Sequence, residues 1–506
     1  MVTMVDYIVV GAGASGCVLS RRLVDAGFTV CLVEAGQLRV RHPMVDDIGG
    51  FVNLWGGTHD WAWPTVPQPD LAGRSIVINQ GRIVGGSSAI NAMMYVRCNQ
   101  ADYRLLSERS GGAWAAGDVT AAFTALENYL DGPAPGRFTG GAMSVRSCPD
   151  PASYSPEFQA AAIEHGYGGD DFDYNGPEQM NGAGPLQFNI DAEGRRHSAF
   201  RAYLEPILGS PLLHLMPQTH ARRIVFEGTR AVALEVTGAD GTARRLTFGR
   251  GLVLALGTLQ TPGLLLRSGV GPAADLTAAG IPVVADLPAV GANLQDHLQL
   301  PVLFRLKKDL PQPDILTGNV LFTNINGHGE PGTPDLQLNF TPAVPRPLAR
   351  MLPPLHGPAM IFLPILIRPK SVGAVKLRRD GTTAIDPRYL SDPSDLALLG
   401  KALDLVRSLA ASRAFSGLAG EELAPGAVDA EGYIRGGSTT LWHPAGTVAL
   451  GTDVADSVVG ADLSVHGLEG LHVCDASVMP RANSGNNQVP SMILAEIGAR
   501  KIAAAA

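Results

Sequence analysis

The chain has 506 residues, a net charge of −8 and a charged fraction of only 17%. It carries no basic cluster of the kind that binds nucleic acid, and no apolar run approaches the ~20 residues that span a bilayer. Its five cysteines are scattered without a CxxC pair, so neither a disulfide framework nor a metal site is indicated. We expect a soluble, cytoplasmic protein of two or three folding units, with no metal, no nucleic-acid partner and no membrane partner.

The first 34 residues have the pattern of a dinucleotide site. Apolar residues 6–10 predict a strand, the glycine-rich residues 11–16 a tight turn, and residues 17–23 a helix. Residues 29–33 predict a second strand. This order of strand, turn, helix and strand is far more specific than a glycine triplet alone.

Each glycine of the turn has a physical task. Gly11 permits the turn, Gly13 lets the backbone approach a pyrophosphate, and Gly16 allows the helix to pack closely on the strand. Glu34 follows Gly16 by 18 residues, near the spacing of a carboxylate that binds a ribose hydroxyl. A carboxylate there disfavours a 2′-phosphate, so the segment predicts FAD or NAD rather than NADP.

Further motifs follow along the chain. The run Gly-Gly-Ser-Ser at 85–88, followed by helix-forming residues up to 97, predicts a second helix N-terminus with free backbone N–H groups. Residues 251–257 predict a buried strand, and residues 263–267 a helix that ends at a Ser-Gly pair. Alternation over 335–340 indicates a half-buried strand.

These segments, read together with the C-terminal ones, resemble the glucose–methanol–choline (GMC) family of flavin oxidoreductases. The resemblance covers the whole chain in the order of the family. The segments that carry it are 85–93, 256–272, 290–297, 442–447, 465–480 and 484–490.

The resemblance implies an α/β fold in which a Rossmann-like FAD-binding domain is interleaved with a substrate domain carrying a mostly antiparallel sheet. The FAD-binding domain would comprise residues 1–149, 211–300 and 435–506. The substrate-binding domain would comprise residues 150–210 and 301–434. Within the second domain, 374–378 is predicted to form a strand, and 395–411 has the periodicity of a helix.

By matching positions, the resemblance also implies a set of FAD contacts drawn from across the chain. They are Gly11, Gly13, Ala14, Ser15, Gly16, Glu34, Ala35, Gly86, Ser87, Asn91, Ala92, Met93, Ala221, Gly257, Asp475, Ala476, Gln488 and Val489. An alternative for Asp475 is a carboxylate that only caps a turn or helix. Some members tether the flavin through a histidine where this chain has Ile90, which has no nucleophilic atom, so noncovalent FAD is expected.

Alcohol oxidation needs a base for the hydroxyl proton, and imidazole suits this task because its pKa lies near working pH. In the family the histidine of the His-Pro-x-Gly-Thr motif faces the flavin, and here this residue is His443. The alternative for His443 is a core histidine bonded to backbone. The family places a second histidine or an asparagine about forty residues later. Gln488 is assigned to that position, with Asn487 or Asn486 nominated if the register slips.

The sequence therefore predicts an FAD-dependent oxidoreductase that oxidises a small-molecule alcohol, with O2 or another acceptor reoxidising the cofactor. An FAD-containing lyase of the same fold, an NAD-dependent dehydrogenase and a non-catalytic flavin-binding protein remain as alternatives. The motifs leave open the alcohol, the choice between oxidase and dehydrogenase, and the oligomeric state.

Overall fold

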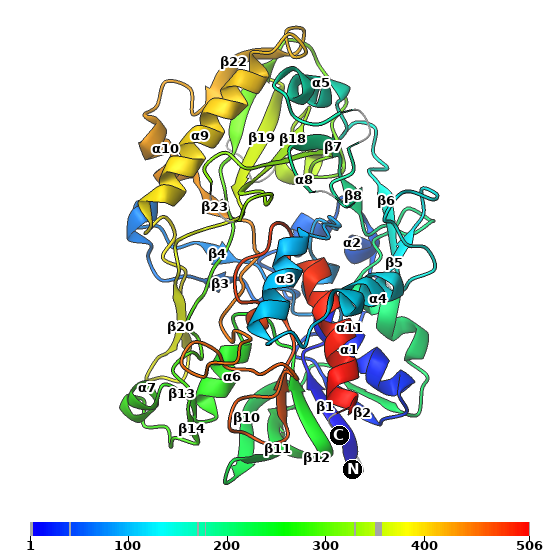
Figure 1. Cartoon of the computed structure of the whole chain (residues 1–506), viewed down its shortest axis with the longest axis vertical. Coiled ribbons are helices and arrows are strands. Elements are labelled where there is room, and N and C mark those ends of the chain that lie inside the picture. Colours follow the sequence, from blue (N-terminus) through cyan, green and yellow to red (C-terminus); the bar gives the residue numbers. More distant parts are fainter. Residues whose placement is uncertain are drawn as a thin grey trace.

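The computed structural model describes residues 4–39, 42–169, 172–177, 179–327, 330–349 and 357–504. Two large sheets lie at opposite ends of an elongated molecule (Figure 1). Both ends of the described chain lie near the sheet that contains β1 (Val5–Val10), which is called the first sheet below. Residues 42–100, which include β3 (Trp63–Pro64) and β4 (Val77–Ile78), run through the middle, between the two sheets.

The first sheet has seven strands in the order β10-β11-β12-β1-β2-β9, with β24 paired to the end of β12. Its strands β1, β2, β9, β24 and the end of β12 are parallel, whereas β10 and β11 join β12 in antiparallel pairs. The strands are β1 (Val5–Val10), β2 (Val30–Val33), β9 (Leu213–Met216), β10 (His220–Glu227), β11 (Arg230–Thr237), β12 (Ala243–Leu254) and β24 (Leu471–Val473).

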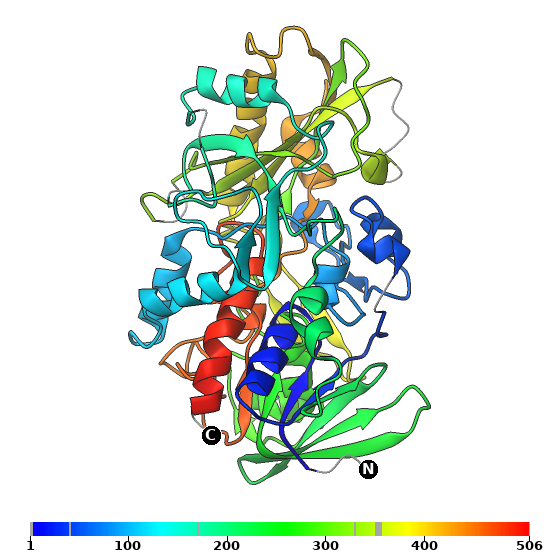
Figure 2. The same ribbon diagram turned by 90° about the vertical axis from the view of Figure 1, so that its right-hand side faces the viewer.

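The parallel part of this sheet forms because β1 and β2 are apolar on both faces and become buried by helices. Helices α1 (Ala14–Asp25) and α11 (Gln488–Ala504) pack on each other beside β1 (Figure 2). The chain leaves β1 toward β2 on one side, and β12 lies on the other side. A crevice at the carboxyl ends of β1 and β12 is the point where such sheets bind ligands.

The second sheet has eight strands in the order β22-β16-β19-β18-β17-β7, with β15 paired to β19 and β23, and all its pairs are antiparallel. Helices α9 (Pro393–Ala410) and α5 (Pro156–Glu164) pack against it. The strands are β7 (Gly182–Pro185), β15 (Leu298–Gln299), β16 (Val302–Leu306), β17 (Asn319–Thr323), β18 (Leu336–Thr341), β19 (Ala359–Leu366), β22 (Ala419–Ala424) and β23 (Thr439–Thr440).

Shorter strands and helices complete the fold. The smaller strands are β3 (Trp63–Pro64), β4 (Val77–Ile78), β5 (Glu127–Tyr129), β6 (Met143–Ser147), β8 (Gln187–Phe188), β13 (Val270–Gly271), β14 (Ala285–Asp286), β20 (Ala374–Leu377) and β21 (Thr383–Asp386). The remaining α-helices are α2 (Pro43–Asp46), α3 (Gln100–Arg109), α4 (Ala116–Leu126), α6 (Thr261–Arg267), α7 (Ala273–Ala278), α8 (Arg346–Ala349) and α10 (Ala430–Gly437).

The predicted α/β architecture with a second, antiparallel sheet is confirmed. The strands predicted over residues 6–10 and 29–33 are β1 and β2. The helix predicted over 395–411 is α9. Every strand of the first sheet comes from the segments assigned to FAD binding, but β15 and β23, from the same segments, join the second sheet. The exact domain boundaries stay a prediction.

Two local predictions were wrong. The Gly-Gly-Ser-Ser run starts only a 3-10 helix, Gly86–Ala89, instead of an α-helix that continues to residue 97. The following backbone is extended because Tyr95 N–H donates to the carbonyl of Gln187, 2.8 Å away, and Met94 pairs with Phe188. The strand β18 is buried along its whole length rather than on one face. Helices α5 and α9 cover the face with Leu336, Leu338 and Phe340, and Asn339 on the other face lies against Met94.

Candidate active site

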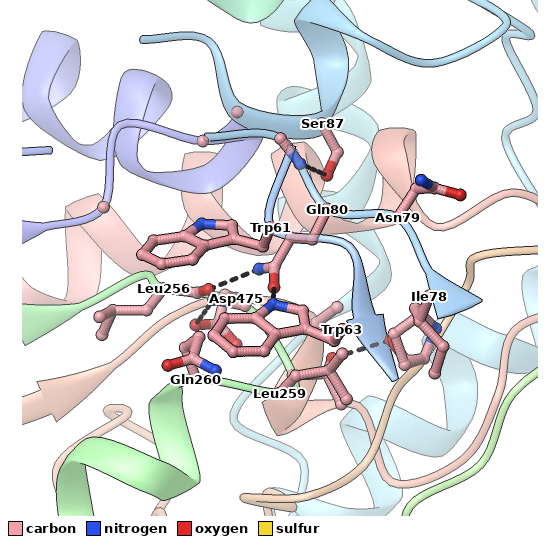
Figure 3. Close-up of a pocket in the computed structure, with 18 of the residues that line it drawn as sticks. Trp61, Trp63, Ile78, Asn79, Gln80, Ser87, Leu256, Leu259, Gln260 and Asp475 are labelled. Carbon is pink, nitrogen blue, oxygen red and sulfur yellow. Dashed lines mark hydrogen bonds between the residues drawn. The ribbon is translucent and has the colours of Figure 1, made fainter. Parts of the chain in front are cut away.

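A cavity of about 910 Å³ runs from the carboxyl ends of β1 and β2 to the segment that contains His443. Figure 3 shows part of its wall, where Trp61 and Trp63 lie beside Gln80 and Leu256. Nearly all the predicted cofactor contacts line this one cavity. They are Gly11, Gly13, Ala14, Ser15, Glu34, Ala35, Gly86, Ser87, Asn91, Ala92, Met93, Ala221, Gly257, Asp475, Ala476 and Gln488.

Two predicted contacts, Gly16 and Val489, are not among the lining residues. Gly16 packs on the turn instead, since a Cβ atom there would lie 1.8 Å from the carbonyl oxygen of Gly11. Val489 is buried in the first turn of α11, so only its backbone could reach a ligand. Ile90, where a histidine tether was sought, is buried and lines the cavity.

The nucleotide end of the cavity is shaped by backbone rather than side chains. Gly11 has a φ of +98°, and a Cβ there would lie 2.5 Å from the carbonyl oxygen of Ala255. A Cβ on Gly86 would lie 2.6 Å from the Cα of Gly13, whereas one on Gly13 would meet nothing within 4 Å. The strand-to-helix turn therefore touches the 85–88 turn on one side and faces open space on the other.

Two buried carboxylates stand at this end. Glu34 accepts backbone hydrogen bonds from Ala12 at 2.9 Å and from Gly36 at 2.7 Å, and burial raises its pKa to about 7. Asp475 accepts from Gly257 N–H at 2.9 Å and from the hydroxyl of Thr261 at 2.6 Å.

Asp475 also caps the 3-10 helix Ala476–Val478 by accepting from Ser477 N–H at 2.8 Å. Burial raises the pKa of this carboxyl. The alternative in which Asp475 caps a turn or helix therefore agrees with its contacts in the structure. Both Glu34 and Asp475 also hold the backbone that forms the cavity wall.

The opposite end of the cavity contains His443, held by a buried carboxylate. Asp296 accepts from the backbone N–H of His443 at 2.8 Å and of His297 at 2.9 Å. Its second oxygen accepts from the hydroxyls of Thr440 and Tyr389. Burial raises the pKa of Asp296 to about 6.

A neighbouring histidine fixes which nitrogen of His443 carries a hydrogen. His297 Nε2 lies 2.9 Å from the carbonyl oxygen of Asn483, and because a carbonyl only accepts, this nitrogen must donate. Burial lowers the pKa of His297 to about 4, so the ring is neutral and its Nδ1 is an acceptor. His443 Nδ1, 3.1 Å away, therefore donates to it. His443, whose pKa is lowered well below 6.5 by burial, keeps a lone pair on Nε2.

The side chain at this Nε2 is Asn486, and Gln488 lies elsewhere on the wall. Asn486 Nδ2 lies 3.2 Å from His443 Nε2, whereas Gln488 bonds Asn91 and Asn189. Asn487 donates to the carbonyl of His443 at 2.8 Å. The structure thus places the two-residue register alternative, Asn486, beside the imidazole. Counting from the α11 motif assigned the wrong residue to this position because the loop before the helix is not regular.

Aromatic and apolar side chains surround the histidine. Trp442 and Trp55 pack with their ring centroids 4.6 Å apart, and both line the cavity together with Leu316 and Leu441. Trp442 has a φ of +61°, a conformation that bulky residues rarely adopt. Such strain next to a functional side chain is typical of active sites.

Sequence reasoning assigned no role to Asp296, His297 or Trp55. A signal for the first two existed, since both lie in the 290–297 segment that contributed to the resemblance. Within the described residues, no group of three His, Cys, Asp or Glu side chains is arranged to hold a metal ion. No helix in that part of the chain is long and apolar enough to cross a membrane.

Comparison with known proteins agrees with this geometry. Two models of the family described as GMC oxidoreductase match residues 5–299 and 369–495. The chain is 33% identical to an alcohol dehydrogenase [acceptor] of Pseudomonas putida, over 99% of this chain and 96% of that protein. It is also 33% identical to an oxygen-dependent choline dehydrogenase of Brucella anthropi, over 97% and 94%.

Solved structures give the same result. Pyridoxine 4-oxidase from Mesorbium loti superposes with a TM-score of 0.89 at 30% identity and 98% coverage of both chains. The chain therefore belongs to the GMC oxidoreductases, enzymes that use FAD and act on CH–OH groups.

Proposed function

We propose that the protein binds FAD noncovalently and oxidises a primary alcohol to an aldehyde, with His443 as the base. The observation that supports this most is the unprotonated Nε2 of His443 in a cavity that also contains the nucleotide turn. Asn486 takes the role of the second polar residue, in place of Gln488.

The residues at the nucleotide end fit a dinucleotide. Gly13 leaves its cavity side open, so that a pyrophosphate can approach the backbone at the start of α1. The second lone pairs of the Glu34 oxygens are available to ribose hydroxyls, since each oxygen accepts one backbone bond. Ile90 offers no atom for a covalent link, so the cofactor is held by these contacts alone.

In the proposed reaction the alcohol oxygen lies within hydrogen-bond reach of both His443 Nε2 and Asn486 Nδ2. The amide donates a hydrogen bond to this oxygen, and Nε2 accepts the hydroxyl proton. FAD, held by the turn at Gly13 and by Glu34, would supply the acceptor for the hydride of the carbinol carbon, and O2 or another acceptor would reoxidise it. The Asp296 and His297 contacts keep the imidazole in the tautomer that can take the proton.

The cavity wall favours a neutral substrate with an apolar body. Trp55, Trp442 and Leu441 supply apolar surface next to the base. Of the described lining residues only Glu34, Asp380 and Asp475 carry a carboxyl group, and none has a contact with His443 or with the aromatic pair. A quaternary ammonium such as choline would find indole faces at this end, but no carboxylate among the described lining residues there to balance its charge.

Anaerobic mixing of the purified protein with a panel of alcohols tests the proposal. Benzyl alcohol, a primary alkanol and choline are compared, and bleaching of the flavin spectrum is followed by readmission of air. We expect bleaching by the neutral alcohols, weak bleaching by choline and release of intact FAD on denaturation. A colourless protein that cannot be reconstituted with FAD, or a flavin that no alcohol bleaches, would contradict the proposal. The second outcome would favour the lyase alternative.

A further inference from the structure

Behind the cavity wall lies a buried arginine that forms no ion pair with any carboxylate that the structure describes. Arg196 is 1% exposed. Its Nε donates to the carbonyl of Val45 at 2.8 Å, one terminal nitrogen donates to Ser88 and Asn91, and the other has no partner. Among the described residues no carboxylate forms an ion pair with it. Asp46 pairs with Arg201 at 2.6 Å instead, and Asp46 and Asp47 attract the guanidinium of Arg196 only from a longer distance.

This guanidinium keeps its positive charge. Burial lowers the pKa of Arg196 to about 9, which still leaves the group protonated at neutral pH. A buried charge without a counter-ion costs free energy, so proteins seldom keep one without a use. Asp46 and Asp47 attract this charge without forming an ion pair with it, so much of the charge of Arg196 is available to a partner bound in the cavity.

A directed chain of amides connects Arg196 with the cavity. Asn91 Oδ1 accepts from Arg196 at 2.8 Å and from Met93 N–H at 3.0 Å. Since both of these groups only donate, the amide of Asn91 has one orientation, and its Nδ2 donates to Gln488 Oε1. Gln488 Nε2 then donates to Asn189 at 2.8 Å. Both Asn91 and Gln488 line the cavity. Their amides donate away from the arginine, Asn91 to Gln488 and Gln488 to Asn189.

We propose that Arg196 is a positioning residue whose charge, passed through Asn91 and Gln488, stabilises the negative charge that the flavin ring gains on reduction. A hydride brings two electrons and one proton, so the ring gains one negative charge as the alcohol becomes an aldehyde and its hydroxyl proton goes to His443. The inference rests on the proposed function, because it requires the ring to lie at the Asn91–Gln488 end of the cavity.

The midpoint potential of the bound flavin is the decisive measurement. In Arg196→Gln the two-electron reduction equilibrium should fall about tenfold, equivalent to about 30 mV for a two-electron couple. The affinity for sulfite, which forms an anionic flavin adduct, should fall about tenfold as well. Arg195→Gln is the matched control, since this neighbouring side chain is 42% exposed and pairs with Asp191 and Glu193 on the surface. It should change neither value.

A second variant guards against misfolding of Arg196→Gln. Asn91→Asp leaves the guanidinium and its bonds to Val45 and Ser88 in place, but sets a carboxylate against it and cancels the charge. It should lower the potential and the sulfite affinity as Arg196→Gln does. Unchanged values in a folded, FAD-containing Arg196→Gln or Asn91→Asp protein would overturn the inference and leave the residue a structural tie. Wild-type protein without FAD, or without bleaching by alcohols, would instead defeat the proposed function.

Discussion

The two ends of the cavity are built in opposite ways. At the nucleotide end the turn, the helix start and Glu34 come from one stretch, residues 11–34, and only the second carboxylate, Asp475, comes from a distant segment. The histidine end is assembled from residues 296–297, 442–443 and 483–488, which come together only when both sheets are in place. Local geometry fixes the first end, whereas long-range packing and hydrogen bonding fix the second.

The largest expected effect is on stability and FAD binding, and it differs between alanine substitutions at two glycines of the same turn. Gly16→Ala sets a Cβ 1.8 Å from the Gly11 carbonyl oxygen, so the helix must move away from β1. Overpacking of this kind costs about 1–3 kcal/mol, and more where backbone cannot yield. We expect loss of FAD and a lower melting temperature. Gly13→Ala, whose Cβ meets nothing within 4 Å, should keep the fold and weaken FAD binding only. Equal melting temperatures for the two variants would contradict this account of the turn.

The histidine end should be sensitive to a residue outside the cavity wall. His297→Leu removes the acceptor for His443 Nδ1, so the imidazole loses its fixed tautomer. Alcohol-driven flavin reduction, measured by stopped flow, should slow roughly 100-fold, the lower end of what a positioned base supplies. His297→Gln can still donate to Asn483 and accept from His443, and should recover part of the rate. Equal rates in the two variants would show that the tautomer is set in another way.

A smaller effect distinguishes the two amides before α11. Asn486→Ala loses one hydrogen bond to the alcohol oxygen, worth about 1.4 kcal/mol, so reduction should slow roughly tenfold. Gln488→Ala should slow the same step less, because Gln488 bonds Asn91 and Asn189 rather than His443. A larger loss in Gln488→Ala would return the second active-site role to that residue.

The smallest expected effect is a shift of the acid limb of the kcat/KM profile to lower pH. Burial, with a contribution from His297, lowers the pKa of His443 well below 6.5. The neutral base is present above this lowered pKa and is lost as pH falls through it, so the acid limb of kcat/KM should lie below pH 6.5.

Stability should follow the same direction. The folded-state pKa of His297 is lowered to about 4, below its unfolded value of about 6.5. The resulting stability is present above pH 6.5 and is lost as pH falls toward 4. An acid limb of kcat/KM above pH 6.5 would contradict a buried neutral pair.

The contrast between the two ends of the cavity also explains which features of the site could be predicted from the sequence. The glycines of the first turn and Glu34 were predictable because each acts within a single strand–turn–helix unit. The resemblance that the motif order carries predicted the two-sheet architecture, which the structure shows, and nominated His443 as the base, which stays a prediction. The helix predicted after residue 88 does not form, because residues 94–95 pair with 187–188, a contact that no local pattern reports.

Three features of the site required the structure. The partnership of His297 with His443 spans 146 positions, and that of Asn486 with His443 depends on an irregular loop. Arg196 reads as an ordinary basic residue beside another arginine, and only its burial and its bond to Asn91 distinguish it. Hydrogen-bond direction and burial are properties of the folded chain, so periodicity and spacing do not reveal them.

The most direct test of the central claim compares His443→Ala with the wild-type protein in two reductions. Anaerobic reduction by the best alcohol should slow by about 10²- to 10⁴-fold, because the variant has no base for the hydroxyl proton. Reduction of the same FAD by dithionite, which needs no base, should be unchanged. Undiminished reduction by the alcohol in the variant would contradict the role of His443.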